Sequence, residues 1–214
     1  SGKSTLGRAM VRLLKPTGGS ILFDGRDITH LAEYELLPLR RRFQMIFQDP
    51  MSSLNPRHRI GQIIAAPLGL HGFDDVQRRM LDALDHVGLP RGFAARYPHE
   101  LSGGQRQRVG IARAIAVRPE FILADEIVSG LDVSSQAQVL NLLENLVKEL
   151  GLTLAFVSHD LSVIRRLCSS VLVLYQGQVV ENAPTAQVFD QPQADYTRDL
   201  LAAIPLPDPD QAWL

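Results

Sequence analysis

The second half of the chain alternates short, continuously apolar segments with longer amphipathic ones, and this alternation constrains the fold most. It predicts helices and strands in strict alternation over residues 103–117, 120–124, 133–149, 152–157, 161–167 and 171–174. Strands that alternate with helices are joined by crossover connections and therefore form a parallel sheet. Strands without polar positions are expected where helices cover both faces of such a sheet. The pattern therefore predicts an α/β fold.

The first half of the chain adds strands and a helical insertion. Apolar residues at helical spacing predict a helix over residues 3–14, which ends at a segment rich in glycine and proline. A short strand and a turn are predicted over residues 20–25, and a buried strand over residues 43–47. Two helical patterns without strand-like alternation follow at residues 60–70 and 75–87. These two patterns indicate a small helical lobe.

The end of the chain returns to short elements. Residues 176–181 predict a final turn and a short strand. Residues 185–214 carry two short helical patterns, and Pro205, Pro207 and Pro209 then exclude a helix.

Charge, cysteine content and hydropathy exclude several classes of protein. The chain has 22 basic and 23 acidic residues, so no overall positive field attracts nucleic acid or anionic lipid. Cys168 is the only cysteine, which excludes an internal disulfide and a cysteine-ligated cluster and suits a reducing cytoplasm. No apolar run approaches the ~20 residues that cross a bilayer. The first methionine is Met10, inside a predicted helix, so we expect an upstream segment to be missing.

The chain opens on a phosphate-binding pattern. Residues 1–5 read Ser-Gly-Lys-Ser-Thr, and Gly-Lys-Ser is the end of the pattern G-x-x-x-x-G-K-[ST]. The amides and dipole of a helix start favour an anion, Lys3 adds a positive charge, and the Ser4 hydroxyl can bind Mg²⁺. Alternatively, Lys3 is a surface lysine at a helix N-terminus.

Adjacent carboxylates end the apolar strand at 119–126. One of the two, Asp125 or Glu126, can face a metal ion through water, while the other, displaced by the turn, can reach an attacking water as base. The alternative is an acidic N-cap for the next helix. Gln48 and His159 also follow predicted strands, at the edge where open α/β sheets bind ligands. Taken singly, Gln48 is a loop amide and His159 a structural or capping residue.

A second candidate phosphate-binding helix start lies at residues 101–105, Leu-Ser-Gly-Gly-Gln. Ser102 and Gln105 fit a capping box. A cap does not require Gly103 and Gly104, whereas close approach of the backbone to a phosphate does. Two such helix N-termini of one chain do not readily contact the same nucleotide. The second is therefore expected to contact a nucleotide bound to a partner.

These motifs together resemble the ATP-binding subunits of ABC transporters. In family order they are the Walker A end at 1–5, the Q-loop at Gln48, the signature motif at 101–105, the Walker B motif at 121–126 with catalytic Glu126, the D-loop at 129–132 and the switch residue His159. The resemblance implies a P-loop NTPase-type parallel sheet flanked by helices, with an inserted helical lobe. It also places the family's first strands and the first half of the Walker A motif upstream.

The resemblance implies three parts of the chain. Residues 1–57 and 98–182 form the nucleotide-binding α/β core, residues 58–97 form the helical lobe that leads to the signature motif, and residues 183–214 form a C-terminal extension. Finer features are similar to the oligopeptide and dipeptide importer group.

The importer-like features are Phe47-Gln48-Asp49-Pro50, Ser53-Leu54-Asn55-Pro56-Arg57, Tyr196-Thr197-Arg198, Leu200-Leu201 and Ala203-Ile204-Pro205. The chain departs from the family at Ile127-Val128, where Pro-Thr or Pro-Val is usual, and at Gly130, where Ala is usual. We expect the loss of proline to loosen the turn that aims Glu126.

The implied mechanism uses ATP and Mg²⁺ in a head-to-tail dimer. The family implies that each nucleotide is bound by Gly2, Lys3, Ser4 and Thr5 of one subunit and by the signature residues of the other, which are Ser102, Gly103, Gly104 and Gln105. Asp132 is a further implied nucleotide-binding residue. The implied metal ligands are Ser4, Gln48 and Asp125, and the implied catalytic residues are Glu126 as base, His159 as stabiliser of the developing charge, and Gln48 as the link to the helical lobe.

The implied partners are a second ATP-binding subunit, identical or different, and membrane permease subunits received by the loop around Gln48 and the lobe. The chain is then a peripheral ATPase at the cytoplasmic face of the membrane. It drives import of peptides or similar small solutes, with a solute-binding protein as an indirect partner and no nucleic acid.

Two other functions stay open. A truncated, non-hydrolysing remnant fits the missing start. A soluble ABC ATPase shares the motifs, but the sequence shows neither the long coiled-coil heptads nor the basic arm expected of one. A GTPase is excluded, because none of Lys3, Lys15 and Lys148 lies in an Asn-Lys-x-Asp motif.

Overall fold

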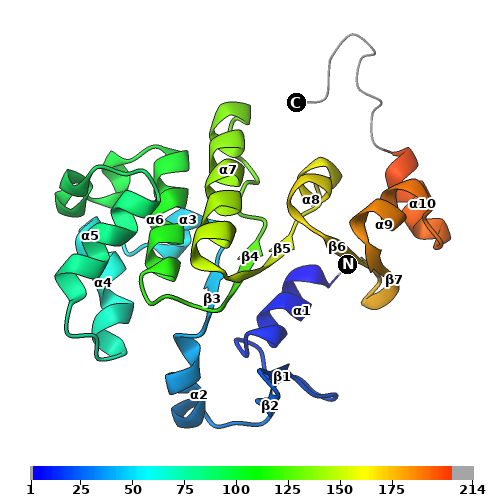
Figure 1. The fold of residues 1–214 in the computed structure, drawn as a ribbon, viewed down its shortest axis with the longest axis horizontal. Helices are drawn as coiled ribbons and strands as arrows, with labels where there is room; N and C mark the ends of the chain where they lie inside the picture. The colour runs from blue at the N-terminus through cyan, green and yellow to red at the C-terminus, as the bar shows by residue number, and fades with distance from the viewer. Residues whose placement is uncertain (1, 204–214) are drawn as a thin grey trace. The chain divides into compact units, whose positions relative to one another are not determined.

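The computed structural model describes residues 2–203 (Figure 1). The chain divides into two compact units. We call Ser4–Val157 the core unit, and Ser158–Leu214 together with Ser1–Lys3 the C-terminal unit.

The core unit begins at the second residue of helix α1 and holds three parallel strands. Its elements, in chain order, are α1 (Lys3–Met10), β1 (Leu22–Phe23), β2 (Arg26–Asp27), α2 (Glu33–Arg40), β3 (Phe43–Ile46), α3 (Pro50–Ser53), α4 (Ile60–Leu70), α5 (Val76–His86), the 3₁₀ turns η1 (Arg91–Ala95) and η2 (Pro98–Glu100), α6 (Gly103–Ile115), β4 (Phe121–Asp125), α7 (Val133–Leu150) and β5 (Thr153–Val157).

The three parallel strands confirm the predicted α/β sheet. Strand β4 lies between β3 and β5, with Phe43 opposite Phe121 and Phe121 opposite Thr153. Because the strands are parallel, their carboxyl ends meet at one edge, where Ile46 pairs with Ala124 and Asp125 with Val157. The residues that follow these strands are therefore brought together.

Helix α1 packs closely on the central strand. A Cβ atom at Gly7 would lie only 3.0 Å from Cδ2 of Leu123, so a glycine allows the helix to approach β4. Leu123 belongs to a buried cluster that includes Val11, Phe43 and Met45. This packing brings the first turn of α1 to the carboxyl edge of the sheet.

Helices α4 and α5 match the predicted helices at 60–70 and 75–87, and they pack on α6 and η1 (Figure 1). Ile60, Ile64, Leu68 and Leu84 are completely buried between these elements. Residues 47–120 contain no strand.

The C-terminal unit corrects one prediction. Its elements are α8 (Leu161–Leu167), β6 (Ser170–Tyr175), β7 (Gln178–Pro184), α9 (Thr185–Asp190) and α10 (Asp195–Ala202). The strand predicted at 171–174 was expected in the parallel sheet, but β6 pairs antiparallel with β7, in a separate two-stranded sheet. The hairpin forms because Gln176 and Gly177 both adopt left-handed backbone conformations between the strands. The prediction was wrong because an apolar run does not specify its strand partner.

Helices α9 and α10 confirm the two short helical patterns after residue 184. The Glu181 carboxylate holds the start of α10 by accepting hydrogen bonds from the backbone amides of Gln193 (2.9 Å) and Ala194 (3.1 Å). Pro205, Pro207 and Pro209 lie outside the described residues, as does the importer-like Ile204-Pro205.

Several other boundaries differ from the predictions. Helix α1 ends at Met10 rather than 14, because Arg12 turns left-handed with φ 54°. The short strand and turn predicted at 20–25 are confirmed by β1 and by Asp24 and Gly25, which lead into β2. Helix α2 was not predicted, and it contains Pro38, which normally disfavours a helix interior. No helix among residues 2–203 is long and apolar enough to span a membrane.

Candidate nucleotide-binding site

The first turn of α1 meets the end of β4 at a hydrogen bond. The Ser4 hydroxyl donates to Oδ1 of Asp125 over 2.9 Å, although the residues are 121 positions apart. The Asp125 residue is only 1% exposed, and the guanidinium of Arg8 lies 4.0 Å from its Oδ2 atom. The structure thus joins two of the three predicted metal ligands.

The donor set at this point fits Mg²⁺. A hydroxyl and a carboxylate supply the oxygen ligands that this ion prefers. Throughout residues 2–203, no group of three or more His, Cys, Asp or Glu side chains could hold a metal ion by itself. The two oxygen ligands of Ser4 and Asp125 suit an ion that completes its coordination with water and substrate phosphates.

Glu126 leaves the strand in a strained conformation. Its φ is 49°, in the left-handed region that costs a non-glycine residue about 1–3 kcal/mol. Its backbone amide still pairs with the Val157 carbonyl at 2.9 Å, so the change of direction comes directly after the β4–β5 ladder. Asp125 is buried, whereas Glu126 is partly exposed. The two adjacent carboxylates therefore occupy different environments, as two different roles require.

The side chain of Gln48 contacts that of Glu126. Its Nε2 donates to Oε2 of Glu126 over 3.1 Å. Gln48 follows β3 and Glu126 follows β4, so the contact lies at the shared carboxyl edge of neighbouring strands. The structure therefore joins Gln48 to the predicted base, whereas the sequence assigned it to the metal ion and the lobe.

The turn after Glu126 is well anchored despite the missing proline. Ile127 is 1% exposed and Val128 4%. The Ser129 amide donates to the Glu126 carbonyl (3.1 Å), and the Leu131 amide to the Val128 carbonyl (3.3 Å). Burial of two apolar side chains thus holds the turn that we expected to be loosened.

The signature segment forms the capping box predicted for it. Ser102 is the N-cap of α6 and its hydroxyl accepts from the Gln105 amide (3.3 Å), while Oε1 of Gln105 accepts from the Ser102 amide (3.0 Å). Gly103 and Gly104 form the first turn beyond this cap.

Asp132 has a structural role that the sequence analysis missed. It is the N-cap of α7, and its carboxylate accepts from the Ser135 amide (2.9 Å) and hydroxyl (2.6 Å). The bond from the Ser135 hydroxyl is the main cause that lowers the pKa of Asp132 below 3.8, with help from the amide. An Asp directly before a predicted helix was a readable signal of this cap.

The other predicted site residues lie at element ends. Gly2 precedes α1 with φ 89°, Lys3 is the first residue of α1, and Thr5 is exposed on its first turn. His159 lies between β5 and α8, next to Asp160, whose side chain caps α8 through the Ser162 amide at 2.9 Å.

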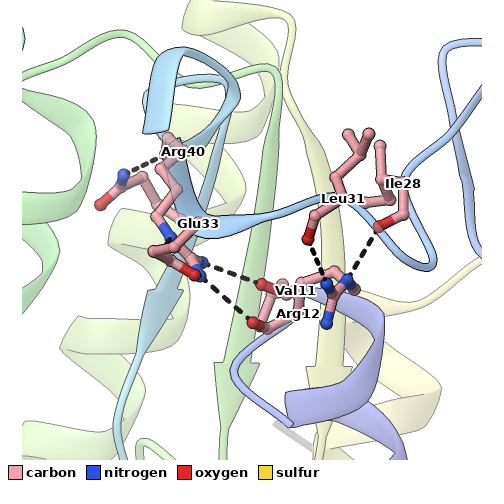
Figure 2. Close-up of polar contacts among 7 residues, drawn as sticks. Val11, Arg12, Ile28, Leu31, Glu33 and Arg40 are labelled. Carbon is pink, nitrogen blue, oxygen red and sulfur yellow. Dashed lines mark hydrogen bonds and ion pairs between the residues drawn. The ribbon is translucent and has the colours of Figure 1, made fainter. Parts of the chain in front are cut away.

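Two arginines secure the far end of α1 (Figure 2). Arg12 donates to the carbonyls of Ile28 and Leu31, each over 2.8 Å. Arg40 donates to the carbonyls of Val11 and Arg12, each over 3.2 Å. The Val11 and Arg12 carbonyls follow the last turn of α1, where a positive charge is favourable. Arg40 also pairs with both oxygens of Glu33 at 2.7 and 3.0 Å. Sequence spacing gave no signal for this arrangement.

A pocket of about 570 Å³ opens beside this end of α1. It lies within the core unit, between the segment after α1, strand β3, the segment after Gln48 and helix α4. Its apolar lining residues are Val11, Leu13, Phe43, Met45, Phe47, Ile63, Ala66 and Pro67. Its charged or titratable lining comprises Arg40, His58 and Arg113, with no acidic side chain among the described residues. The pocket therefore suits an apolar segment with an acidic or polar edge.

A family model described as "ABC transporter" matches residues 1–129. The chain belongs to the ABC transporter family. Its sheet, its Ser4–Asp125 contact and its capped helix α6 are thus parts of an ABC ATPase.

Curated relatives of this family cover almost the whole chain. A putative peptide import ATP-binding protein of Brucella ovis is 52% identical over 213 residues, which are 98% of this chain and 67% of the relative. An oligopeptide transport ATP-binding protein of Bacillus subtilis is 50% identical over 98% of this chain and 70% of its own. A glutathione import ATP-binding protein of Salmonella paratyphi A is 50% identical over 98% of this chain and 34% of its own.

Solved structures agree with the fold. A dimeric ATP-binding cassette in a post-hydrolysis state with ADP and phosphate has a TM-score of 0.76 and 33% identity, covering 86% of this chain and 81% of its own. A component of an ABC transporter complex from Clostridium perfringens has a TM-score of 0.80 and 29% identity, covering 95% of this chain and 80% of its own.

Proposed function

We propose that this ABC ATPase powers the import of peptides or similar small solutes through membrane permease subunits. The supporting observation is the pair of contacts at the carboxyl edge of the sheet, Ser4 with Asp125 and Gln48 with Glu126. The solute class comes from the relatives, whose names specify import of peptides, oligopeptides or glutathione. The importer-like segments around Gln48 agree with this class.

The start of α1 would bind the nucleotide phosphates. Gly2, Lys3, Ser4 and Thr5 offer a helix N-terminus, one ammonium group and two hydroxyls. Ser4 and Asp125, with Gln48, would hold Mg²⁺, which would neutralise charge on the phosphate oxygens. The hydrogen bond between Ser4 and Asp125 keeps both oxygen ligands together before any ligand arrives.

Glu126 would act as general base. A water oxygen attacks the γ-phosphorus, the bond to the bridging oxygen of ADP breaks, and Glu126 accepts the water proton. The left-handed backbone turns Glu126 out of the strand, and Gln48 holds one of its oxygens. His159 would stabilise charge on the departing phosphate.

The second half of each site would come from another ATP-binding subunit. Ser102, Gly103, Gly104 and Gln105 open a second helix N-terminus, and Asp132 opens α7. A related cassette is dimeric with bound ADP and phosphate. We therefore place the two nucleotides between two subunits, each contacted by the signature segment of the opposite subunit.

The pocket beside α1 would receive a helix of a permease subunit. It adjoins the segment after Gln48 and helix α4, the region that the sequence assigned to this contact. A solute-binding protein would act indirectly, on the permease side. The chain would then lie at the cytoplasmic face of the membrane without entering it.

Phosphate release tests the ATPase assignment. Purified chain with Mg-ATP is expected to release phosphate, and Glu126→Gln is expected to lower kcat by about 100-fold or more. Glu149→Gln, at an exposed position on α7, is the matched control and should keep the wild-type rate. Equal rates in the wild type and Glu126→Gln would remove Glu126 as the base.

A further inference from the structure

Helices α6 and α7 meet at their first turns with unusually little space. A Cβ atom at Gly104 would lie 3.2 Å from both Cβ and Oγ of Ser135, and one at Gly103 would lie 3.6 Å from Cδ2 of Leu131. Most real Cβ contacts are longer than 3.2 Å. Gly104 therefore has a reason to be glycine within its own chain, besides the approach of a phosphate considered from the sequence.

Ser135 faces Gly104 and also holds the D-loop carboxylate. Its hydroxyl donates to Oδ2 of Asp132 (2.6 Å), and its amide donates to Oδ1 (2.9 Å). A single side chain is thus in contact with the signature turn and with the cap of α7. A displacement of Ser135 at one contact would therefore change the geometry of the other contact.

The helices are joined again one turn further on. Arg108 of α6 donates to Oε1 of Gln138 of α7 over 2.7 Å, and to the Val87 carbonyl over 3.3 Å. Arg108 and Gln138 lie four and three residues beyond Gly104 and Ser135, on the same helix faces. This second bond limits sliding of α6 along α7, so the contact between Gly104 and Ser135 keeps its register.

We propose that Ser135 is a positioning residue that sets Asp132 relative to Gly104, so that the signature and D-loop segments reach a partner subunit's nucleotide as one unit. The inference rests on the proposed function, in which both segments act at an interface with a second subunit. The Ser135 hydroxyl transmits the position of one segment to the other. Gly104 must stay small to leave room for it.

ATP-driven dimerisation of the chain carrying Glu126→Gln measures this positioning. Adding Ser135→Ala removes the hydroxyl and keeps both the backbone amide and the Cβ atom next to Gly104. We expect the Mg-ATP concentration for half-maximal dimerisation to rise three- to tenfold. Ser134→Ala, at an exposed neighbour on the same helix, should leave it unchanged. Equal midpoints for Ser135→Ala and Ser134→Ala would overturn the inference.

A double-mutant cycle separates positioning from loss of folding. Gly104→Ala and Ser135→Ala should each weaken ATP-driven dimerisation, and the double variant should lose less than the two single losses combined, because without Oγ the added Cβ has more room. Ser134→Ala in place of Ser135→Ala is the control and should leave the Gly104→Ala loss unchanged. If the Gly104→Ala and Ser135→Ala losses simply add while the melting temperatures match, the two positions act independently and the inference is wrong.

The proposed function is tested separately by the parent variant. If the chain with Glu126→Gln alone does not dimerise with Mg-ATP, the composite site and the role of Ser135 both fail. If it dimerises and Ser135→Ala has no effect, only the role of Ser135 fails.

Discussion

Gln48 and Glu126, 78 residues apart, are joined by a 3.1 Å hydrogen bond from Nε2 to Oε2 at the ends of neighbouring strands. The bond connects the segment that enters the helical lobe to the proposed base. Under the proposed function, this amide links the lobe to the residue that would accept the proton of the attacking water.

Replacing Gln48 should slow hydrolysis more than it weakens nucleotide binding. Gln48→Ala removes the amide that holds Oε2 of Glu126, and we expect kcat to fall by about 10- to 100-fold. Steady-state phosphate release against ATP concentration gives kcat and KM. Gln187→Ala, at an exposed position on α9, is the control. A raised KM with unchanged kcat would show that Gln48 acts only in binding.

Replacing Ser4 should destabilise the chain even without nucleotide. Ser4→Ala leaves Oδ1 of the buried Asp125 without the Ser4 hydroxyl, which should lower the free energy of unfolding by about 1–3 kcal/mol. Urea denaturation without ATP measures the change, and Ser20→Ala, at an exposed site, is the control. An unfolding free energy equal to that of the wild type would mean that the bond adds nothing to stability.

The two partners of the ion pair in Figure 2 should differ in effect. Arg40→Gln loses the bonds to the carbonyls of Val11 and Arg12 as well as the Glu33 pair, for an expected cost of about 1–3 kcal/mol. Glu33→Gln loses only an exposed pair, worth about 0–1 kcal/mol. Urea denaturation of both variants compares them. Equal losses would show that the carbonyl contacts do not stabilise the end of α1.

Acid should weaken the cap of α7. The Ser135 hydroxyl and amide lower the pKa of Asp132 below 3.8, so the cap contributes stability above pH 3.8 and loses it as pH falls through the lowered pKa. NMR titration of the Asp132 carboxyl should show a higher pKa in Ser135→Ala than in the wild type. An identical pKa in both proteins would remove the hydroxyl as its main cause.

Much of the core unit could be predicted because apolar runs locate buried strands. Strands β3, β4 and β5 appear where residues such as Ile122 and Leu123 lack polar neighbours, and their order brings the residues at their ends together. The left-handed turn at Glu126 could not be predicted, because it depends on burial of Ile127 and Val128 in the folded chain.

Contacts between distant segments also could not be predicted from the sequence. Arg12 and Arg40 bind carbonyls that become neighbours only after α1 and α2 have packed. The pairing of β6 was misjudged because its composition suits either kind of sheet, and the turn at Gln176 and Gly177 decides the outcome. Ser135 belongs to no motif recognised in the sequence, and its proposed positioning role rests on its closeness to Gly104 in the folded chain.

Light scattering of the chain carrying Glu126→Gln, with and without Mg-ATP, tests the composite ATP site most directly. Blocking proton transfer should trap ATP between two subunits. We predict that the molar mass is that of a dimer with Mg-ATP and that of a monomer without it. Lys3→Ala in the same background should remain monomeric in both conditions. A mass that does not change when Mg-ATP is added would contradict the composite site.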